Sequence, residues 1–211
     1  MTEKSKGLKY KFLIIMSTAY LAVDINLQGF LGLMPFIREE FSLSASRAGL
    51  YSTFYFMLAT VVAIFSGSIV DRIGSKIGLV AGTLSLGVLM FFHSQAGSFN
   101  LILFLAMLSG LAFSILTPSL NKAVMQKVSA ENRATSMGIM QMGGGVGGFA
   151  GAAVLPFLGE IVGWRNALLF SAFIALLVGI FIFFFYKDDS LTGAEGSQRN
   201  NISFKEAIVQ L

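Results

Sequence analysis

Six long apolar runs divide this 211-residue sequence, and they constrain its fold more than any other feature. Each run is close to or above the roughly 20 helical residues needed to cross about 30 Å of hydrocarbon. The runs are continuously apolar, whereas the strands of a membrane barrel alternate apolar and polar residues. We therefore expect an all-α membrane protein with six transmembrane helices, near residues 12–34, 47–70, 77–95, 100–121, 134–158 and 164–186.

The composition agrees with a membrane protein and argues against several other classes. Hydrophobic residues make up 55% and charged residues 12% of the chain, which is too little charge to cover a soluble domain. The basic residues form short clusters between apolar runs, so we expect no nucleic-acid partner. The chain has no cysteine and a single histidine, His93, so we expect no metal site and no cofactor. It also lacks a nucleophile–base set and a phosphate-binding G-x-x-x-x-G-K-[ST] loop, so we expect no enzyme activity.

The distribution of lysine and arginine predicts the orientation in the membrane. Twelve of the fifteen lie in the N-terminal segment, the second and fourth connections and the tail, and the other three are Arg38, Arg47 and Arg165. The positive-inside rule then places the N-terminal segment (1–11) and the tail (187–211) in the cytoplasm of a multi-pass cell-membrane protein. We expect His93 and Trp164 to lie at the outer interface, Trp164 as an anchor.

The connection between the second and third runs has the sequence GSIVDRIGSK. Gly67 would let one helix approach another closely, and Gly74 would permit a tight reversal of the chain. Asp71 could accept hydrogen bonds from a neighbouring helix or pair with a nearby arginine. Arg72 and Lys76 would hold the loop on the cytoplasmic side.

The joint spacing of these residues resembles the loop signature of the major facilitator superfamily, G-x-x-x-D-R-x-G-[RK]-[RK], with Ser75 replacing the first terminal basic residue. The resemblance implies an N-terminal six-helix bundle of that family. It also implies that Asp71 and Arg72 latch the outward-facing state by contacts between two halves of a transporter. The segment GWRNALLF, residues 163–170, is similar to the entry of the sixth helix in members that carry organic anions.

The fifth run contains a glycine-rich stretch in ENRATSMGIMQMGGGVGGFAG, residues 131–151. Gly143, Gly144, Gly147 and Gly148 form small-xxx-small pairs, which predict close helix packing in a moving interface. The stretch resembles the fifth helix of the same family, whose antiporter branch carries a G-P-x-x-G-G element. Glycine replaces the proline here, so the antiporter signature is incomplete, and symport and uniport remain open.

Asp24 is the one ionisable residue deep inside a predicted span. A carboxylate at mid-bilayer costs about 3 kcal/mol on insertion scales, and such residues face polar cavities or proton and ion paths. Gln28 and Tyr20 lie one helical turn away on the same face, whereas Asn26 points elsewhere. We expect Gln141, buried in the fifth helix, as a further member of this site. The alternative is an aspartate that is neutral or hydrogen-bonded to a neighbouring helix for structural reasons alone.

The family resemblance implies a secondary active transporter that moves a small solute by alternating access, with a proton or cation coupled through Asp24. Members have twelve spans in two bundles, so the expected partners are the solute, the coupling ion, the lipid bilayer and a second six-helix bundle. The chain would then be a fragment of a longer transporter. It could instead be a half-transporter that needs a partner chain, or a non-transporting sensor or scaffold.

The polar stretch 187–201 is expected to be a flexible linker towards the second bundle. Beyond it, Ser203 and Glu206 have the spacing of a capping box, which predicts the start of a further helix.

Overall fold

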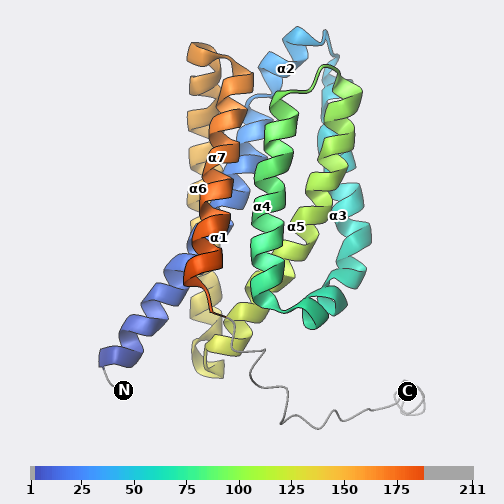
Figure 1. Ribbon diagram of the computed structural model, residues 1–211. Helices are drawn as coiled ribbons and strands as arrows, with labels where there is room; N and C mark the ends of the chain where they lie inside the picture. The colour runs from blue at the N-terminus through green and yellow to red at the C-terminus, as the bar shows by residue number, and fades with distance from the viewer. Residues whose placement is uncertain (1–2, 188–211) are drawn as a thin grey trace, which may run out of the picture.

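The structure, a computed structural model, describes residues 3–187, with side chains from Tyr10 onward. This part of the chain is helical throughout and contains no strand (Figure 1). Its elements, in chain order, are α1 (Glu3–Gly32), α2 (Met34–Glu40), α3 (Ala45–Ile73), α4 (Ser75–Ser94), α5 (Phe99–Lys127), the short 3-10 helix η1 (Ala130–Asn132), α6 (Arg133–Val162) and α7 (Trp164–Phe185).

Six of these helices are long and apolar enough to cross a membrane. The spans are Tyr10–Gly32, Ala45–Ile73, Ser75–Ser94, Phe99–Lys127, Ala130–Val162 and Trp164–Phe185. The predicted all-helical fold with six candidate spans is confirmed. The predicted linker and the helix expected to start at Ser203 lie outside the described residues.

Local chemistry explains where several helices begin and end. The Oγ atoms of Ser44 and Ser98 cap α3 and α5 by accepting hydrogen bonds from backbone N–H groups, at 3.2 and 3.3 Å. Gly74 and Gly163 separate consecutive helices with φ angles of 86° and 85°, a region that favours glycine. The tight reversal predicted at Gly74 is therefore confirmed.

The helices pack in pairs around two buried apolar clusters. The helix α1 packs chiefly against α6 and also against α7, α4 packs against α7 and α5, and α3 packs against α5 (Figure 1). The least buried spans are α3 and α6, with 22% of their most apolar segment inside the bundle against 56% for α1. These two helices therefore present broad apolar faces that no other described helix covers.

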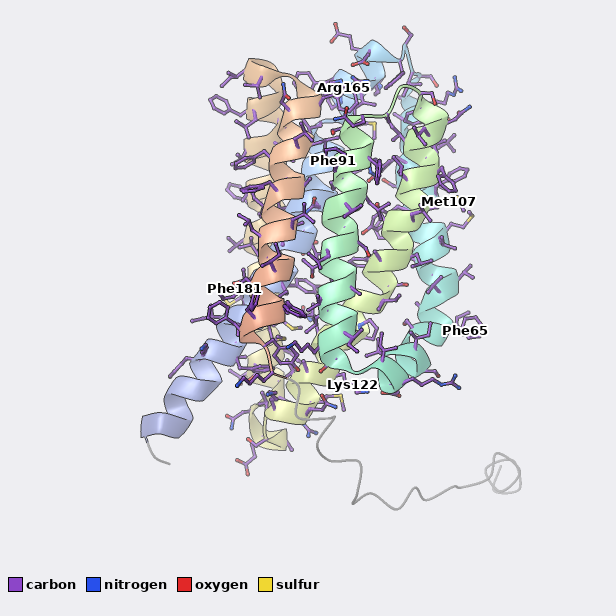
Figure 2. The ribbon with its side chains drawn as sticks, in the orientation of Figure 1. Phe65, Phe91, Met107, Lys122, Arg165 and Phe181 are labelled. Atoms are coloured by element: carbon purple, nitrogen blue, oxygen red, sulfur yellow. The ribbon has the colours of Figure 1, made fainter. Side chains whose placement is uncertain are left out.

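The two ends of the bundle differ in charge. One end holds the start of α1, the α3–α4 and α5–α6 connections and the end of α7, and the opposite end holds α2 (Figure 1). We call the first the basic end, because the described cations there are Lys11, Arg72, Lys76, Lys122, Lys127, Arg133 and Lys187. We call the second the α2 end. Figure 2 labels one residue of each, Lys122 and Arg165.

Three lysines of the basic end lie over aromatic rings at the end of α7. Each comes from a different helix, at a distance typical of cation–π contacts. The pairs are Lys11 with Phe185 at 5.3 Å, Lys76 with Phe183 at 5.2 Å and Lys127 with Tyr186 at 5.4 Å. The end of α7 is thereby connected to α1, α4 and α5.

Candidate functional site

Asp24 lies in the membrane-spanning part of α1, on the side that faces α6. Its side chain is half-buried, Tyr20 is half-buried one turn earlier, and Gln28 is exposed one turn later. Within the described residues, no side chain donates a hydrogen bond to the Asp24 carboxylate. The carboxylate is therefore open to a proton, a cation or a polar solute group.

Glycines of α6 make the room for these three side chains. A Cβ atom built on Gly144 would overlap the Tyr20 ring and lie 2.5 Å from Oδ2 of Asp24. One built on Gly148 would lie 3.2 Å from Cγ of Gln28. Any larger residue at Gly144 would displace the predicted site residues from their positions.

Three further glycine contacts bring the backbones of α1 and α6 together. Cβ atoms built on Gly143 and Gly147 would overlap the backbone of Ser17 and Leu21, and one on Gly151 would lie 2.6 Å from the Ile25 carbonyl oxygen. The close packing predicted for the α6 glycines is confirmed. We call this contact the glycine seam, and its members are Gly143, Gly144, Gly147, Gly148 and Gly151.

A buried amide lies on the opposite face of α1. The Asn26 side chain is 1% exposed, donates to the Ala22 carbonyl oxygen at 2.6 Å and accepts a 2.6 Å hydrogen bond from Ser171 Oγ in α7. Asn26 therefore points away from Asp24, as the sequence predicted. Its pairing with Ser171 was not predicted, because no spacing within the sequence connects residues so far apart.

The prediction that Gln141 is buried is wrong. Its side chain is exposed on α6. It precedes Gly148 by seven residues, which is about two helical turns, so the two residues occupy nearly the same face. Gln141 consequently borders the open side of the glycine seam and lies nearer the basic end than Asp24 does.

The donor set at this site suits protons and polar solutes better than a structural metal. Asp24 supplies one carboxylate, Tyr20 a hydroxyl and Gln28 an amide. Within residues 3–187, no group of three or more His, Asp or Glu residues could hold a metal ion.

The loop signature forms contacts inside the bundle at the basic end. Lys122 Nζ in α5 donates to Asp71 Oδ1 at 2.9 Å and to the Val70 carbonyl oxygen at 3.0 Å. The partner of Asp71 is thus a lysine, where an arginine had been one of the expected partners. A Cβ atom on Gly67 would meet nothing within 4 Å in the described chain, so the close approach expected there stays a prediction.

Ser75, which replaces a basic residue of the signature, is completely buried. Its Oγ lies 2.9 Å from the Tyr186 hydroxyl and donates to Gln126 Oε1 at 3.3 Å. A charged side chain buried at this position would lose its hydration, which is a physical reason for an uncharged residue here.

At the α2 end, Glu40 connects separate parts of the chain. Its carboxylate accepts hydrogen bonds from Trp164 Nε1 at 2.6 Å and from Arg165 Nη1 at 2.7 Å. The other Arg165 amino group, Nη2, donates to the Ala96 carbonyl oxygen at 2.8 Å. Partial burial acts to raise the pKa of Glu40, but the hydrogen bonds from Arg165 and Trp164 and the Arg165 charge lower it below its ordinary value.

Trp164 and His93 both lie near helix ends at the α2 end, and both are buried within the bundle. Trp164 is 6% exposed, so its ring packs within the bundle, and its role as an interfacial anchor stays a prediction. His93 is fully buried, with Nδ1 2.8 Å from the Leu89 carbonyl oxygen. Its ring lies 5.1 Å from that of Phe30 and 6.0 Å from that of Tyr51, centroid to centroid. The rings of Phe30 in α1 and Tyr51 in α3 therefore pack against a side chain that the sequence placed, without neighbours, at the outer end of its helix.

Comparisons with known proteins agree with the fold. The family model described as Major Facilitator Superfamily matches residues 16–209. The chain is similar to "Probable sulfoacetate transporter SauU" of Cupriavidus necator, with 26% identity over 85% of this chain and 42% of that protein. It is also similar to the hexuronate transporter of Bacillus subtilis, with 23% identity over 73% of this chain and 36% of that protein.

Two further matches extend this comparison. Multidrug resistance protein 1 of Bacillus subtilis is 26% identical over 69% of this chain and 37% of its own length. The chain thus spans less than half the length of these curated relatives. A crystal structure of a bacterial homologue of the human lysosomal transporter Spinster, inward-facing and unoccupied, matches the whole chain and 50% of its own, with a TM-score of 0.74 and 18% identity.

Proposed function

The chain belongs to the major facilitator superfamily, and on this premise we propose that it forms the N-terminal half of a secondary transporter. The transporter moves a small solute across the membrane by alternating access. Relatives that match most of this chain are named transporters, which supports the proposal. Because the match covers less than half of each of those relatives, the proposed transporter contains a second six-helix bundle.

The observation that carries this proposal is the environment of Asp24. The carboxylate lies on a membrane-spanning helix, is half-buried and has no hydrogen-bond donor among the described side chains. A carboxylate at this depth is costly, and it is usually retained for a proton or ion path. We assign Asp24 as the coupling site for a proton or cation, with Tyr20, Gln28 and Gln141 lining the solute path beside it.

The glycine seam supports a moving role for α6. Glycine contacts let two helices approach within backbone distance, so small shifts of α6 need not force bulky side chains past one another. The uncovered faces of α3 and α6 are where we place the second bundle. The solute path then lies between that bundle and the α1–α6 pair.

The basic end faces the cytoplasm in this proposal, because lysine and arginine concentrate there. Asp71 and Arg72 act as the latch between the two halves. The Asp71–Lys122 ion pair holds the aspartate in position from inside this half.

The experiment uses the full-length gene product in proteoliposomes with an imposed pH gradient. Sulfoacetate, a hexuronate and a cationic dye serve as probes, one for each solute class named among the relatives. We expect wild-type protein to accumulate one of them. Asp24→Asn should lose gradient-driven accumulation and retain exchange of the same probe between equal pools, because exchange needs no net movement of the coupling ion.

Asn26→Asp, two residues from Asp24, is the matched control for a carboxylate at the same depth. Combined with Asp24→Asn, it should not restore accumulation, because Asn26 faces α7 and not the glycine seam. Full accumulation by Asp24→Asn alone would remove Asp24 from the coupling mechanism. Failure of all three probe classes to accumulate in wild-type protein would count against the transporter proposal.

A further inference from the structure

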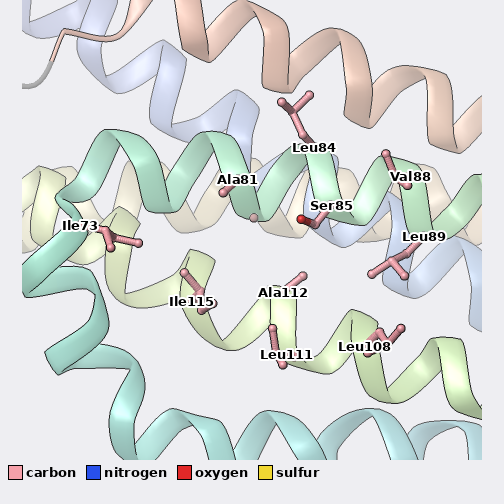
Figure 3. Close-up of a pocket in the computed structure, with 11 residues that line it drawn as sticks. Ile73, Ala81, Leu84, Ser85, Val88, Leu89, Leu108, Leu111, Ala112 and Ile115 are labelled. Atoms are coloured by element: carbon pink, nitrogen blue, oxygen red, sulfur yellow. The ribbon is translucent and has the colours of Figure 1, made fainter.

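An apolar groove runs along the surface between α4 and α5, with a volume of about 530 Å³ (Figure 3). Ala81, Ser85 and Val88 lie along α4, and Leu108 and Leu111 lie on α5. Ser85 carries the one polar side chain among the eleven lining residues. The groove shares no residue with the glycine seam or with the Asp24 site.

Small residues form the floor of the groove. Gly82 and Ala112 are buried at its base, and a Cβ atom on Gly82 would lie only 3.0 Å from Leu116 Cβ. From Ala81 to Leu89 the α4 wall extends about 12 Å, at 1.5 Å per residue. The groove is apolar, extends along the helix axes and lies entirely on candidate membrane-spanning helices, so it suits a hydrocarbon chain better than a polar solute.

One end of the groove reaches the basic end of the bundle. Ile73, the last residue of α3, lines the groove there. The preceding residue, Arg72, is exposed, and its guanidinium makes no hydrogen bond or ion pair with any described residue. Lys122, by contrast, is held by Asp71. A cation with several N–H donors therefore directly precedes, in the sequence, the residue that lines this end of the groove, at the end of a candidate membrane-spanning helix.

We propose that this groove binds one acyl chain of an anionic phospholipid whose phosphate is held by Arg72. The apolar walls bury the hydrocarbon, and the arginine supplies the charge that distinguishes an anionic from a zwitterionic headgroup. Basic side chains at the membrane interface attract anionic lipids in this way. The groove is separate from Asp24, whereas Arg72 is also a member of the proposed latch.

The test uses the absence of cysteine from the sequence, which makes any introduced cysteine unique. Ser85→Cys and Val88→Cys place a small fluorophore on the groove wall, and Leu177→Cys places it on the exposed face of α7. Each labelled chain is reconstituted into phosphatidylcholine vesicles containing a minority of phosphatidylglycerol. In parallel preparations, bromine atoms that quench the dye are carried on the acyl chains of one lipid or the other.

At the groove positions, we expect brominated phosphatidylglycerol to quench about fivefold more than its share of the lipid predicts. At Leu177→Cys, quenching should follow that share. Adding Arg72→Gln should abolish the enrichment at the groove, whereas Arg47→Gln, at the α2 end of the same helix, should leave it unchanged. Quenching in proportion to lipid composition at both groove positions would overturn the proposal. Equal enrichment at Leu177→Cys, or enrichment that survives Arg72→Gln, would overturn it as well.

Discussion

Two carboxylates in the N-terminal part of the chain, Asp24 and Glu40, differ in their hydrogen-bond partners. Glu40 accepts hydrogen bonds from an indole and a guanidinium, and the same guanidinium connects it to the α4–α5 turn. Asp24 lies against glycines and a tyrosine ring, and no described side chain donates to it. Donors that already bond to a carboxylate leave it fewer acceptor sites for a ligand, whereas a carboxylate without donors keeps all of them. Glu40 therefore has structural partners, and Asp24 is the carboxylate to which we assign a function in the proposal above.

The largest expected change in folding stability comes from substitution in the glycine seam, which leaves space for the Asp24 side chain. Gly147→Ala places a methyl group against the backbone of Leu21, which cannot rotate away, so we expect a loss of about 1–3 kcal/mol in folding stability. Thermal unfolding of the chain in detergent micelles measures it. Gly145→Ala is the control, because nothing lies within 4 Å of its Cβ position, and it should be neutral or stabilising. Equal stability of the two variants would show that the seam tolerates side chains.

The next largest loss of folding stability is expected when the contacts of Glu40 are removed. Arg165→Met removes the donor shared by Glu40 and the Ala96 carbonyl oxygen, and we expect a loss of about 1 kcal/mol. The groups are partly exposed, so water replaces some of the lost interaction. Arg47→Met, a cation without a described carboxylate partner at the same end, should change the unfolding temperature less. An unchanged unfolding temperature for Arg165→Met would remove Glu40 from its structural role.

The lowered pKa of Glu40 predicts a smaller effect that depends on pH. The unfolded chain binds the Glu40 proton more tightly than the folded chain, so the stabilisation is present above about pH 4.5 and is lost as pH falls through the lower folded pKa. The difference in unfolding temperature between wild type and Glu40→Gln should therefore shrink on acidification. A difference that grows as pH falls would contradict the assigned direction of the pKa shift.

The smallest effect on stability is expected at Asp24 itself. Asp24→Asn keeps the shape of the side chain and removes no described hydrogen bond, so stability should change by less than about 0.5 kcal/mol. The same unfolding measurement at neutral pH checks it. A loss larger than that caused by Glu40→Gln would mean that Asp24 is held by donors, and the contrast between the two carboxylates would fail.

Much of the fold follows from properties that the sequence carries locally. Continuous apolar runs predicted six helices, and the positive φ of Gly74 and the α1–α6 glycine contacts were visible as residue types at fixed spacings. The one-turn spacing of Asp24 and Gln28 likewise placed them on one face. Such features depend on a single helix and its period, so no knowledge of neighbouring helices is needed.

The errors concern contacts between distant segments. His93 and Trp164 lie near helix ends, and the sequence alone did not show that other helices bury both of them. Gln141 was expected to be buried in its helix, but it lies on a face of α6 that points away from the neighbouring helices. The Ser171–Asn26 hydrogen bond joins residues 145 positions apart. Burial of each of these residues depends on which helix lies beside it, and this is settled only by tertiary packing.

The Ser171–Asn26 hydrogen bond also sets the rotation of α1 about its own axis. An amide in an apolar interior loses its partner if the helix turns by even a fraction of a turn, so this bond selects one angular setting. Two residues along a helix correspond to about 200°. The hydrogen bond that holds Asn26 towards α7 therefore directs the carboxylate of Asp24 to nearly the opposite side of α1, which is the side facing α6.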